Sequence, residues 1–436
     1  MSNILFVSGS YFPYATANAV CAKKFEDALR AQGHHVIYCN RKHDLDEPDF
    51  HLVNGTEIFT VGKNSDIFFQ SIGKLRQLRL PNGMHGAFSF GMKCYQLMMQ
   101  LRNFGKRKSS LRQEAREMYL DEYAEKIREV IAAKKIDLII SVSMPFDSHC
   151  AVLRAMHAIG EIRPKWIAYC IDAYWSKAGV NPGEVPAMKK EEREIFQYCD
   201  HILMLDTIEK DYAGNEFAAF RTKITSLPLP LFDLQSPLED CSAEGIETRE
   251  DVSEIVFTGT VYDDFSNIDA FIDVAREFQG EKIRFHFLGK IYPKSLANLR
   301  QLQQSMPGKL EIYGRMPYPY AQGSMQRADV LLNLANDNAN QIPSKIFQYM
   351  MCRKPVLNIY RMEEDVGTMY LKKYPLAFNF DCKRDLVAQC QQLREWLQKA
   401  QSLSTTMKEL DACFHEVTSA VVCDKFCDLC NTLLGK

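Results

Sequence analysis

The chain has 436 residues, of which 46% are hydrophobic and 25% are charged, and its formal net charge is −2. This length exceeds what one hydrophobic core usually supports, so we expect two domains of roughly 200 residues each. The composition excludes a disordered or low-complexity chain. The small net charge excludes attraction of the whole molecule to a polyanion, and binding of nucleic acid is not expected.

The cysteines and the N-terminus bear on the cellular compartment. The chain contains 14 cysteines, yet its opening run, Met1–Pro13, has no basic region and no apolar stretch longer than a strand. No window reaches membrane-spanning length. We therefore expect reduced thiols and a cytoplasmic location.

In the first half of the chain, short apolar runs alternate with longer amphipathic runs, which predicts a parallel α/β sheet. A strand is expected at Asn3–Ser8, followed by a helix at Ala17–Gln32 that stops at Gly33. This first domain is expected to span residues 1–235. Its other strands are predicted at His35–Cys39, Asp137–Val142, Lys165–Cys170 and His201–Leu205.

The stretch 229–253 contains Pro, Ser, Gly and seven acidic residues, and we interpret it as an exposed connector. The alternation then resumes, which predicts a second domain at about 250–404. Two doubly wound units in tandem place a ligand cleft between their carboxyl strand ends. The strands of the second unit are predicted at Glu254–Gly259, Ile283–Gly289, Lys309–Gly314, Val330–Leu334 and Pro355–Ile359.

The C-terminal segment, about 405–436, is predicted to be helical because its apolar and cysteine side chains recur at steps of three and four residues. Cys427 and Cys430 form a pair with zinc-ligand spacing. We favour core packing for both, since no second ligand pair lies nearby and cysteine packs as a small hydrophobe. The stripe consists of Cys413, Val417, Ala420, Cys423, Cys427, Cys430 and Leu434.

The run from Asn340 to Val356, which begins Asn-Gln-Ile-Pro-Ser-Lys, resembles the donor-binding motif of the GT-B glycosyltransferases, particularly the large retaining family 4. Four more segments resemble that family in its order along the chain. They are Phe12-Pro13 with Gly33-His-His-Val36, Asp137–Pro145 with His149, Cys170–Trp175, and Ile255–Gly259.

The resemblance implies an α/β, GT-B architecture of two Rossmann-like domains facing across a cleft, with the C-terminal helix packing back toward the first domain. It implies a hexosyltransferase-like, retaining enzyme. Such an enzyme moves a sugar from a nucleotide diphosphate sugar to a saccharide or lipid-linked saccharide in surface polysaccharide or glycolipid synthesis. It also implies no cofactor and no metal.

The donor motif has a physical interpretation of its own. Pro343 and Ser344 favour a helix start, where free amides and the helix dipole attract a diphosphate beside the Lys345 ammonium. By resemblance, Gln348 contacts ribose and Asn340 contacts the donor sugar. The alternative is an ordinary surface crossover with a solvated lysine.

The sequence departs from the family in two ways. The family usually carries two glutamates where this chain has Asn340 and Gln348, so negative charge beside the transferred sugar is lost. The family's basic pair after the second domain's first strand is also missing. Other candidate donor contacts there are Gly259, Thr260, Lys290 and Arg315.

The catalytic candidates lie in the first domain. Asp172 follows a predicted strand and is expected to bind a sugar hydroxyl or act as a base; the alternative is a turn carboxylate. His149 is expected at the cleft rim, with a structural role as the alternative. Gly9, Ser10 and Asn18 are candidates for an acceptor loop, although the family's glycine pair is Ala17-Asn18 in this chain.

A basic insertion is predicted at about 67–116. Residues 67–113 contain nine Lys and Arg and no acidic residue, interleaved with aromatic side chains. This pattern suits contact with an anionic membrane surface, and a lipid-linked acceptor would explain it. The alternative is a solvated helical excursion.

Three other functions were compared with glycosyl transfer. A non-catalytic GT-B subunit that binds sugar or serves as a scaffold remains open because two carboxamides replace glutamates. A nucleotide-sugar epimerase of the same fold also remains open. A dinucleotide oxidoreductase is excluded because its glycine fingerprint is absent.

Overall fold

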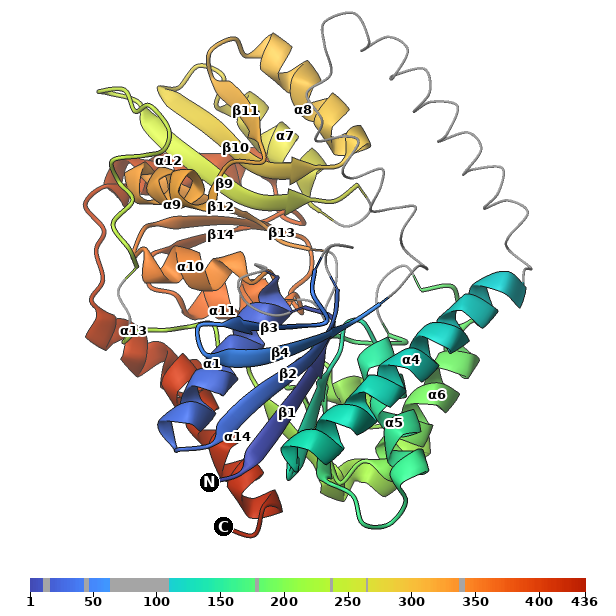
Figure 1. Cartoon of the computed structure of the whole chain (residues 1–436). Helices are drawn as coiled ribbons and strands as arrows, with labels where there is room; N and C mark the ends of the chain where they lie inside the picture. Colours follow the sequence, from blue (N-terminus) through green and yellow to red (C-terminus); the bar gives the residue numbers. More distant parts are fainter. Residues whose placement is uncertain are drawn as a thin grey trace, which may run out of the picture.

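A computed structural model describes residues 1–10, 16–42, 47–62, 110–176, 180–235, 238–263, 266–336 and 342–436. Asn340 and residues 67–109 of the predicted insertion lie outside these described residues. The chain forms two α/β domains, each with its own sheet (Figure 1).

The first domain contains an eight-stranded sheet of order β3-β4-β2-β1-β5-β6-β7-β8. Its strands pair in parallel except for β3, which runs antiparallel to β4. The central strands are buried on both faces, which explains their continuous apolar runs. The strands are β1 (Asn3–Ser8), β2 (His35–Arg41), β3 (Phe50–Val53), β4 (Thr56–Val61), β5 (Leu138–Val142), β6 (Lys165–Cys170), β7 (His201–Leu205) and β8 (Ile224–Leu227).

Helices cover both faces of this sheet, with α1 and α14 on one side and α4, α5 and α6 on the other (Figure 1). Helix α1 begins at the Thr16 cap and ends at Gln32, after which Gly33 has φ +84°, as the helix stop predicted. The helices and 3₁₀ turns of the chain's first part are α1 (Ala17–Ala31), α4 (Ser110–Lys134), α5 (Asp147–Ile159), α6 (Val185–Tyr198), η2 (Glu209–Tyr212) and η3 (Asn215–Lys223).

The second domain contains a six-stranded, fully parallel sheet of order β11-β10-β9-β12-β13-β14. Strands β9 and β10 are the longest and continue past their neighbours at the carboxyl end. The elements are β9 (Ser253–Val261), α7 (Ile268–Glu277), β10 (Ile283–Ile291), α8 (Pro293–Ser305), β11 (Leu310–Gly314), α9 (Tyr318–Arg327), β12 (Val330–Leu334), α10 (Lys345–Met351), β13 (Val356–Tyr360), α11 (Val366–Lys373), β14 (Ala377–Asp381) and α12 (Leu386–Ala400).

Each sheet reverses its strand order at one point. The reversal lies between β1 and β5 in the first sheet and between β9 and β12 in the second. Open α/β sheets bind ligands outside the carboxyl strand ends at such a switch point, because the crossover helices diverge there. The two switch points therefore define where the candidate site is built.

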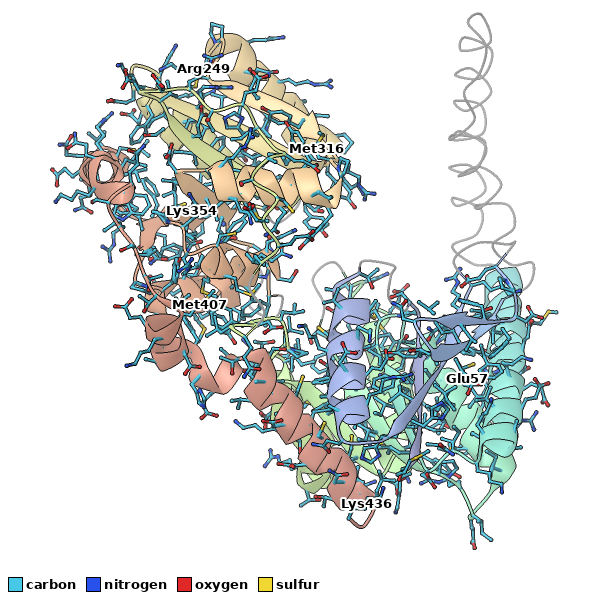
Figure 2. All side chains as sticks on the ribbon, turned by 60° about the vertical axis from the view of Figure 1, so that its left-hand side comes forward. Glu57, Arg249, Met316, Lys354, Met407 and Lys436 are labelled. Carbon is cyan, nitrogen blue, oxygen red and sulfur yellow. The ribbon has the colours of Figure 1, made fainter. Side chains whose placement is uncertain are left out.

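Most residues of the predicted connector between 239 and 250 are exposed, as expected, but Cys241 and Ile246 are buried. Residues 238–250 pack on α9, where Arg327 donates to three backbone carbonyls of the segment and Ile246 is fully buried. A side chain at Gly323 would lie 2.2 Å from the Cys241 carbonyl oxygen, so glycine permits this close approach. Arg249 accordingly lies on the second domain (Figure 2).

After α12 the chain returns to the first domain through α13 (Met407–Phe414), η4 (His415–Val417) and α14 (Ser419–Leu433). In Figure 2 this path runs from Met407 to Lys436. Helix α14 packs on α1, where the rings of Phe426 and Phe25 stack with centroids 3.9 Å apart. The predicted return of the C-terminal helix is confirmed, and Cys427 and Cys430 are both buried in it.

Candidate functional site

The first switch point brings the ends of β1 and β5 into close contact. A Cβ atom at Gly9 would lie 2.0 Å from Pro145 Cδ, so only glycine fits beside the Pro145 ring. Ser143 lies in the same loop as Pro145 and is buried; its hydroxyl accepts the Ile171 amide proton at 3.1 Å. The loops after β1, β5 and β6 are thereby tied together.

Asn18 connects these loops to the first turn of α1. Its Nδ2 atom donates to the Ser143 carbonyl at 3.0 Å and lies 3.5 Å from Asp172 Oδ2. It also lies 3.4 Å from the Met144 carbonyl oxygen. Asn18 and Asp172 are both half-buried. The candidate acceptor residue Asn18 and the candidate catalytic residue Asp172 therefore occupy one polar cluster.

Ser10 belongs to the same region. Its hydroxyl is 2.7 Å from the Thr16 hydroxyl, which also accepts the Ala19 amide proton as the cap of α1. The Ser8 hydroxyl donates to the Ser10 carbonyl at 2.6 Å. Since local partners satisfy these groups, the first-domain cluster is held in place by hydrogen bonds before any ligand arrives.

At the second switch point, α10 is anchored to the end of β9. The Tyr349 hydroxyl accepts the Thr258 amide proton at 2.8 Å and donates to the Thr258 carbonyl at 3.1 Å. Burial raises the pKa of Tyr349 to about 12, so this hydroxyl stays neutral. The anchor places Lys345 beside Gly259, whose missing Cβ atom would lie 3.9 Å from Lys345 Cγ.

Lys345 is half-buried, and its ammonium donates to the Gln348 side-chain oxygen at 2.8 Å. It forms no ion pair within the described part of the chain. Burial lowers the pKa of Lys345 because the charged form loses hydration. A buried ammonium with only a neutral amide partner favours an anionic ligand.

The helix-start prediction holds only in part. Ser344 is the residue before α10, but its side chain makes no capping hydrogen bond. Helix α10 has only seven residues, so the Lys345 charge outweighs any contribution of the helix dipole. Gln348 lies one turn into α10, as expected, and holds Lys345.

Two more cations lie at neighbouring strand ends. Lys290 pairs in register with Thr260 and is exposed, with its ammonium 4.0 Å from the ring centroid of Tyr292. Arg315 follows β11 and is also exposed. Neither cation forms an ion pair with another described residue. Both remain available to a diphosphate.

Gly259 and Gly289 lie side by side at this edge, both with positive φ. A Cβ atom at Gly289 would lie 1.8 Å from the Gly259 carbonyl oxygen, whereas one at Gly259 would meet only side-chain carbons at 3.6 Å or more. Gly289 is therefore needed for strand packing, whereas a Cβ atom at Gly259 would meet its neighbours only at ordinary contact distances.

The comparisons with known proteins concern the fold. No family model matches the sequence, and no curated protein matches it. A sucrose-phosphate synthase from Thermosynechococcus elongatus matches with 13% identity over 100% of both chains and a TM-score of 0.67. Anabaena HepE, in complex with UDP and glucose, matches with 11% identity over 99% of this chain and 100% of its own, at a TM-score of 0.58.

The lipopolysaccharide outer core galactosyltransferase WaaB matches with 10% identity over 97% of this chain and 98% of its own, at a TM-score of 0.55. The chain has the GT-B fold. At these identities the comparisons establish the GT-B architecture and not the activity. The predicted fold class is thus confirmed.

In this GT-B chain His149 is fully buried, so its predicted position at an exposed cleft rim is wrong. The imidazole is fully buried, with Nδ1 2.6 Å from the Ser141 hydroxyl, to which Trp166 also donates at 2.7 Å. Burial lowers the pKa of His149 to about 3. His149 is therefore a neutral core residue that does not reach a substrate in this conformation.

Several residues that position the candidate site have no signal of their own in the sequence. Ser143 and Pro145 lie within a segment that resembles the family, and Tyr349 lies within the donor motif. Their neighbours lie far along the chain, 125 residues apart for Ser143 and Asn18. Helical spacing places Tyr349, four residues after Lys345, on the same side of α10 as that lysine.

No group of three His, Cys, Asp or Glu side chains in the described ranges is arranged to hold a metal ion. No described helix is both long and apolar enough to cross a lipid bilayer.

Proposed function

We propose that the protein is a retaining, family-4-like hexosyltransferase. It transfers a sugar from a nucleotide diphosphate sugar to a saccharide or lipid-linked saccharide acceptor. The setting would be the synthesis of surface polysaccharide or glycolipid at the cytoplasmic face of a membrane. UDP and glucose in the Anabaena HepE complex make uridine nucleotides the first donors to test.

One observation carries this proposal. Lys345 presents a half-buried ammonium without a carboxylate partner in the described part of the chain, next to Gly259 near the carboxyl end of β9. A diphosphate would supply the missing negative charge, and Lys290 and Arg315 lie on adjacent strands to share it. Charge-assisted hydrogen bonds of this kind are about twice as strong as neutral ones.

The chemistry follows from the arrangement. The bond between the sugar anomeric carbon and the diphosphate oxygen breaks while the acceptor oxygen bonds to the same carbon. The acceptor proton passes to an oxygen of the leaving diphosphate. Lys345 stabilises the charge that develops on this group, so it acts where catalytic electrostatics matter most. Asp172, held near Asn18, would bind a hydroxyl of the transferred sugar.

The test measures thermal stabilisation by UDP-, GDP-, ADP- and CMP-linked sugars, followed by release of free nucleotide from any donor that binds. Lys345→Ala should weaken binding of the nucleotide diphosphate about 100-fold, since a buried charge pair contributes roughly 3 kcal/mol. Lys399→Ala, an exposed lysine on α12, is the matched control. No stabilisation by any donor would overturn the proposal.

The finer parts of the proposal have their own readouts. Nuclear magnetic resonance of the product would report retention or inversion at the anomeric carbon. Co-sedimentation with vesicles that contain 30% phosphatidylserine would test membrane contact. The basic insertion proposed for that contact lies outside the described residues.

A non-catalytic GT-B subunit is the second candidate. It is favoured by Gln348, a neutral amide already bound to Lys345 where the family has a glutamate. Such a subunit would bind a nucleotide sugar and never turn it over. Conversion of the donor without an acceptor would instead indicate an epimerase.

A further inference from the structure

Three asparagines lie side by side in the sheet of the second domain. Asn333 of β12 pairs in register with Asn358 of β13, which pairs in register with Asn379 of β14. Asn358 is fully buried, and Asn333 is buried as well. All other residues of β12 and β13 are apolar or aromatic, so these amides are exceptional in their strands. We call the three side chains the asparagine ladder.

The hydrogen bonds of the asparagine ladder form one chain that ends on α11. Asn333 Nδ2 donates to Asn358 Oδ1 at 2.8 Å. Asn358 Nδ2 donates to Asn379 Oδ1 at 3.0 Å and to the Thr368 hydroxyl at 3.2 Å. Asn379 Nδ2 donates to the Leu371 carbonyl at 3.3 Å. Because Thr368 and Leu371 lie one turn apart on α11, the ladder holds this helix at two points.

The asparagine ladder restricts where α11 can lie. A buried amide without a hydrogen-bond partner is costly, so each amide requires its neighbour at hydrogen-bond distance. An apolar side chain at position 358 would impose no such directional requirement. A fully satisfied buried network of this kind makes the packing around it unique. Helix α11 therefore has one position over the sheet in which the ladder is satisfied.

The first turn of α11 packs closely on the donor motif. Asp365 caps the helix, since its Oδ2 atom accepts the Thr368 amide proton at 2.7 Å. Gly367 is buried, and a Cβ atom there would lie 2.7 Å from Pro343 Cγ and 3.1 Å from Pro343 Cδ. The Pro343 ring has no flexible end that can turn aside. Any displacement at Gly367 must therefore move Pro343, which lies two residues before Lys345.

A second contact joins α11 to α10. The rings of Tyr370 and Phe347 meet edge to face, with centroids 5.2 Å apart. Phe347 is buried and lies between Lys345 and Tyr349 in α10. The two helices are neighbours in the second domain (Figure 1). Helix α10 is thus held by β9 through Tyr349 and by α11 through Phe347.

We infer that the asparagine ladder sets the position of Lys345 through α11, and that Asn358 and Gly367 are positioning residues for the diphosphate site. The inference rests on the proposed function for the ligand of Lys345. The path from the ladder to α10 is a property of the second domain and needs no sugar donor.

The first test uses Gly367→Ala. Alanine favours a helix more than glycine does, so a role in α11 alone predicts unchanged or higher stability and unchanged affinity. The close approach to Pro343 instead predicts a displaced Lys345, and UDP should bind about tenfold more weakly in calorimetry. Gly280→Ala is the matched control, because a Cβ atom at this exposed glycine of the second domain would meet nothing within 4 Å.

A double-mutant cycle isolates the contact. Pro343→Ala removes the two ring atoms that the new Cβ atom would meet. In this background, Gly367→Ala should change UDP affinity less than twofold. An equal loss in both backgrounds, or wild-type affinity in Gly367→Ala alone, would contradict the inference.

The second test measures hydrogen exchange of the α10 amides by mass spectrometry without any nucleotide. Thr368→Val keeps the shape of the side chain but removes the hydroxyl that accepts from Asn358, so exchange in α10 should become about tenfold faster. Thr368→Ser keeps the hydroxyl and should stay within twofold of wild type. Gln389→Ala removes two buried hydrogen bonds to the Asp381 backbone of β14, and it controls for general destabilisation.

Unchanged exchange in Thr368→Val, or the same acceleration in Gln389→Ala, would overturn the inference. If wild type binds no UDP or other nucleotide diphosphate, the proposed function fails. Exchange in α10 then still decides whether the asparagine ladder controls the position of that helix, so the two failures are distinguishable.

Discussion

The two switch points of the molecule are built in opposite ways. At the first, every polar side chain that we assign to the acceptor side already has a hydrogen-bond partner, as with Asn18 and Ser10. At the second, Lys345, Lys290 and Arg315 form no ion pair with another described residue. The first switch point is preorganised by hydrogen bonds, and the second carries positive charge that suits an anionic ligand.

Substitution of Gly289 should give the largest effect, because Gly289 packs directly against the β9 backbone at the second switch point. Gly289→Ala places a Cβ atom against the Gly259 carbonyl at positive φ, so we expect a loss on the order of 4 kcal/mol of folding free energy. Gly259→Ala has the same backbone strain without the clash. Chemical denaturation of both variants measures the difference. Equal losses would mean that the close approach of β9 and β10 is not required.

Asn18 should give an intermediate effect at the first switch point. Asn18→Ala removes its hydrogen bond to the Ser143 carbonyl, and we expect about a tenfold loss in kcat/KM for the acceptor. Asn18→Asp should be worse, because it places a second carboxylate beside Asp172. Donor affinity, measured by calorimetry, should stay unchanged in both. A loss of donor affinity in either variant would show that the two switch points are not separate in function.

Lys290 should give the smallest effect. It is exposed and held over Tyr292, so Lys290→Ala should weaken binding of a nucleotide diphosphate about threefold at low salt. The difference should shrink as the salt concentration rises, since exposed charges are screened. The effect of Lys345→Ala should persist, because that ammonium is half-buried. Titration of the nucleotide diphosphate into both variants at two salt concentrations distinguishes the two lysines.

The parallel strands were predictable because they are buried on both faces and read as unbroken apolar runs, as β5 does. Strand β3 gave no such signal, since Phe50 and Leu52 on it are exposed. Strands β4, β8 and β14 were not predicted either. The exposure of most of segment 238–250 was predictable from its acidic composition, whereas the burial of Ile246 depends on contacts with α9, which local composition does not encode.

The same distinction between local signals and distant contacts applies to the candidate site. Lys345 and Gly259 could be found from the motif, since their roles depend on local spacing. The neutral state of His149 could not be predicted, because it arises from burial in the folded core. What the sequence lacked was the environment of each titratable group.

The stacking of Phe426 on Phe25 has a practical consequence for engineering. The last helix covers an apolar face of the first domain, although it follows the second domain along the chain. A chimaera that exchanges the second domain therefore needs two junctions, one before β9 and one after α12. Excision at a single junction would leave that face bare and favour aggregation.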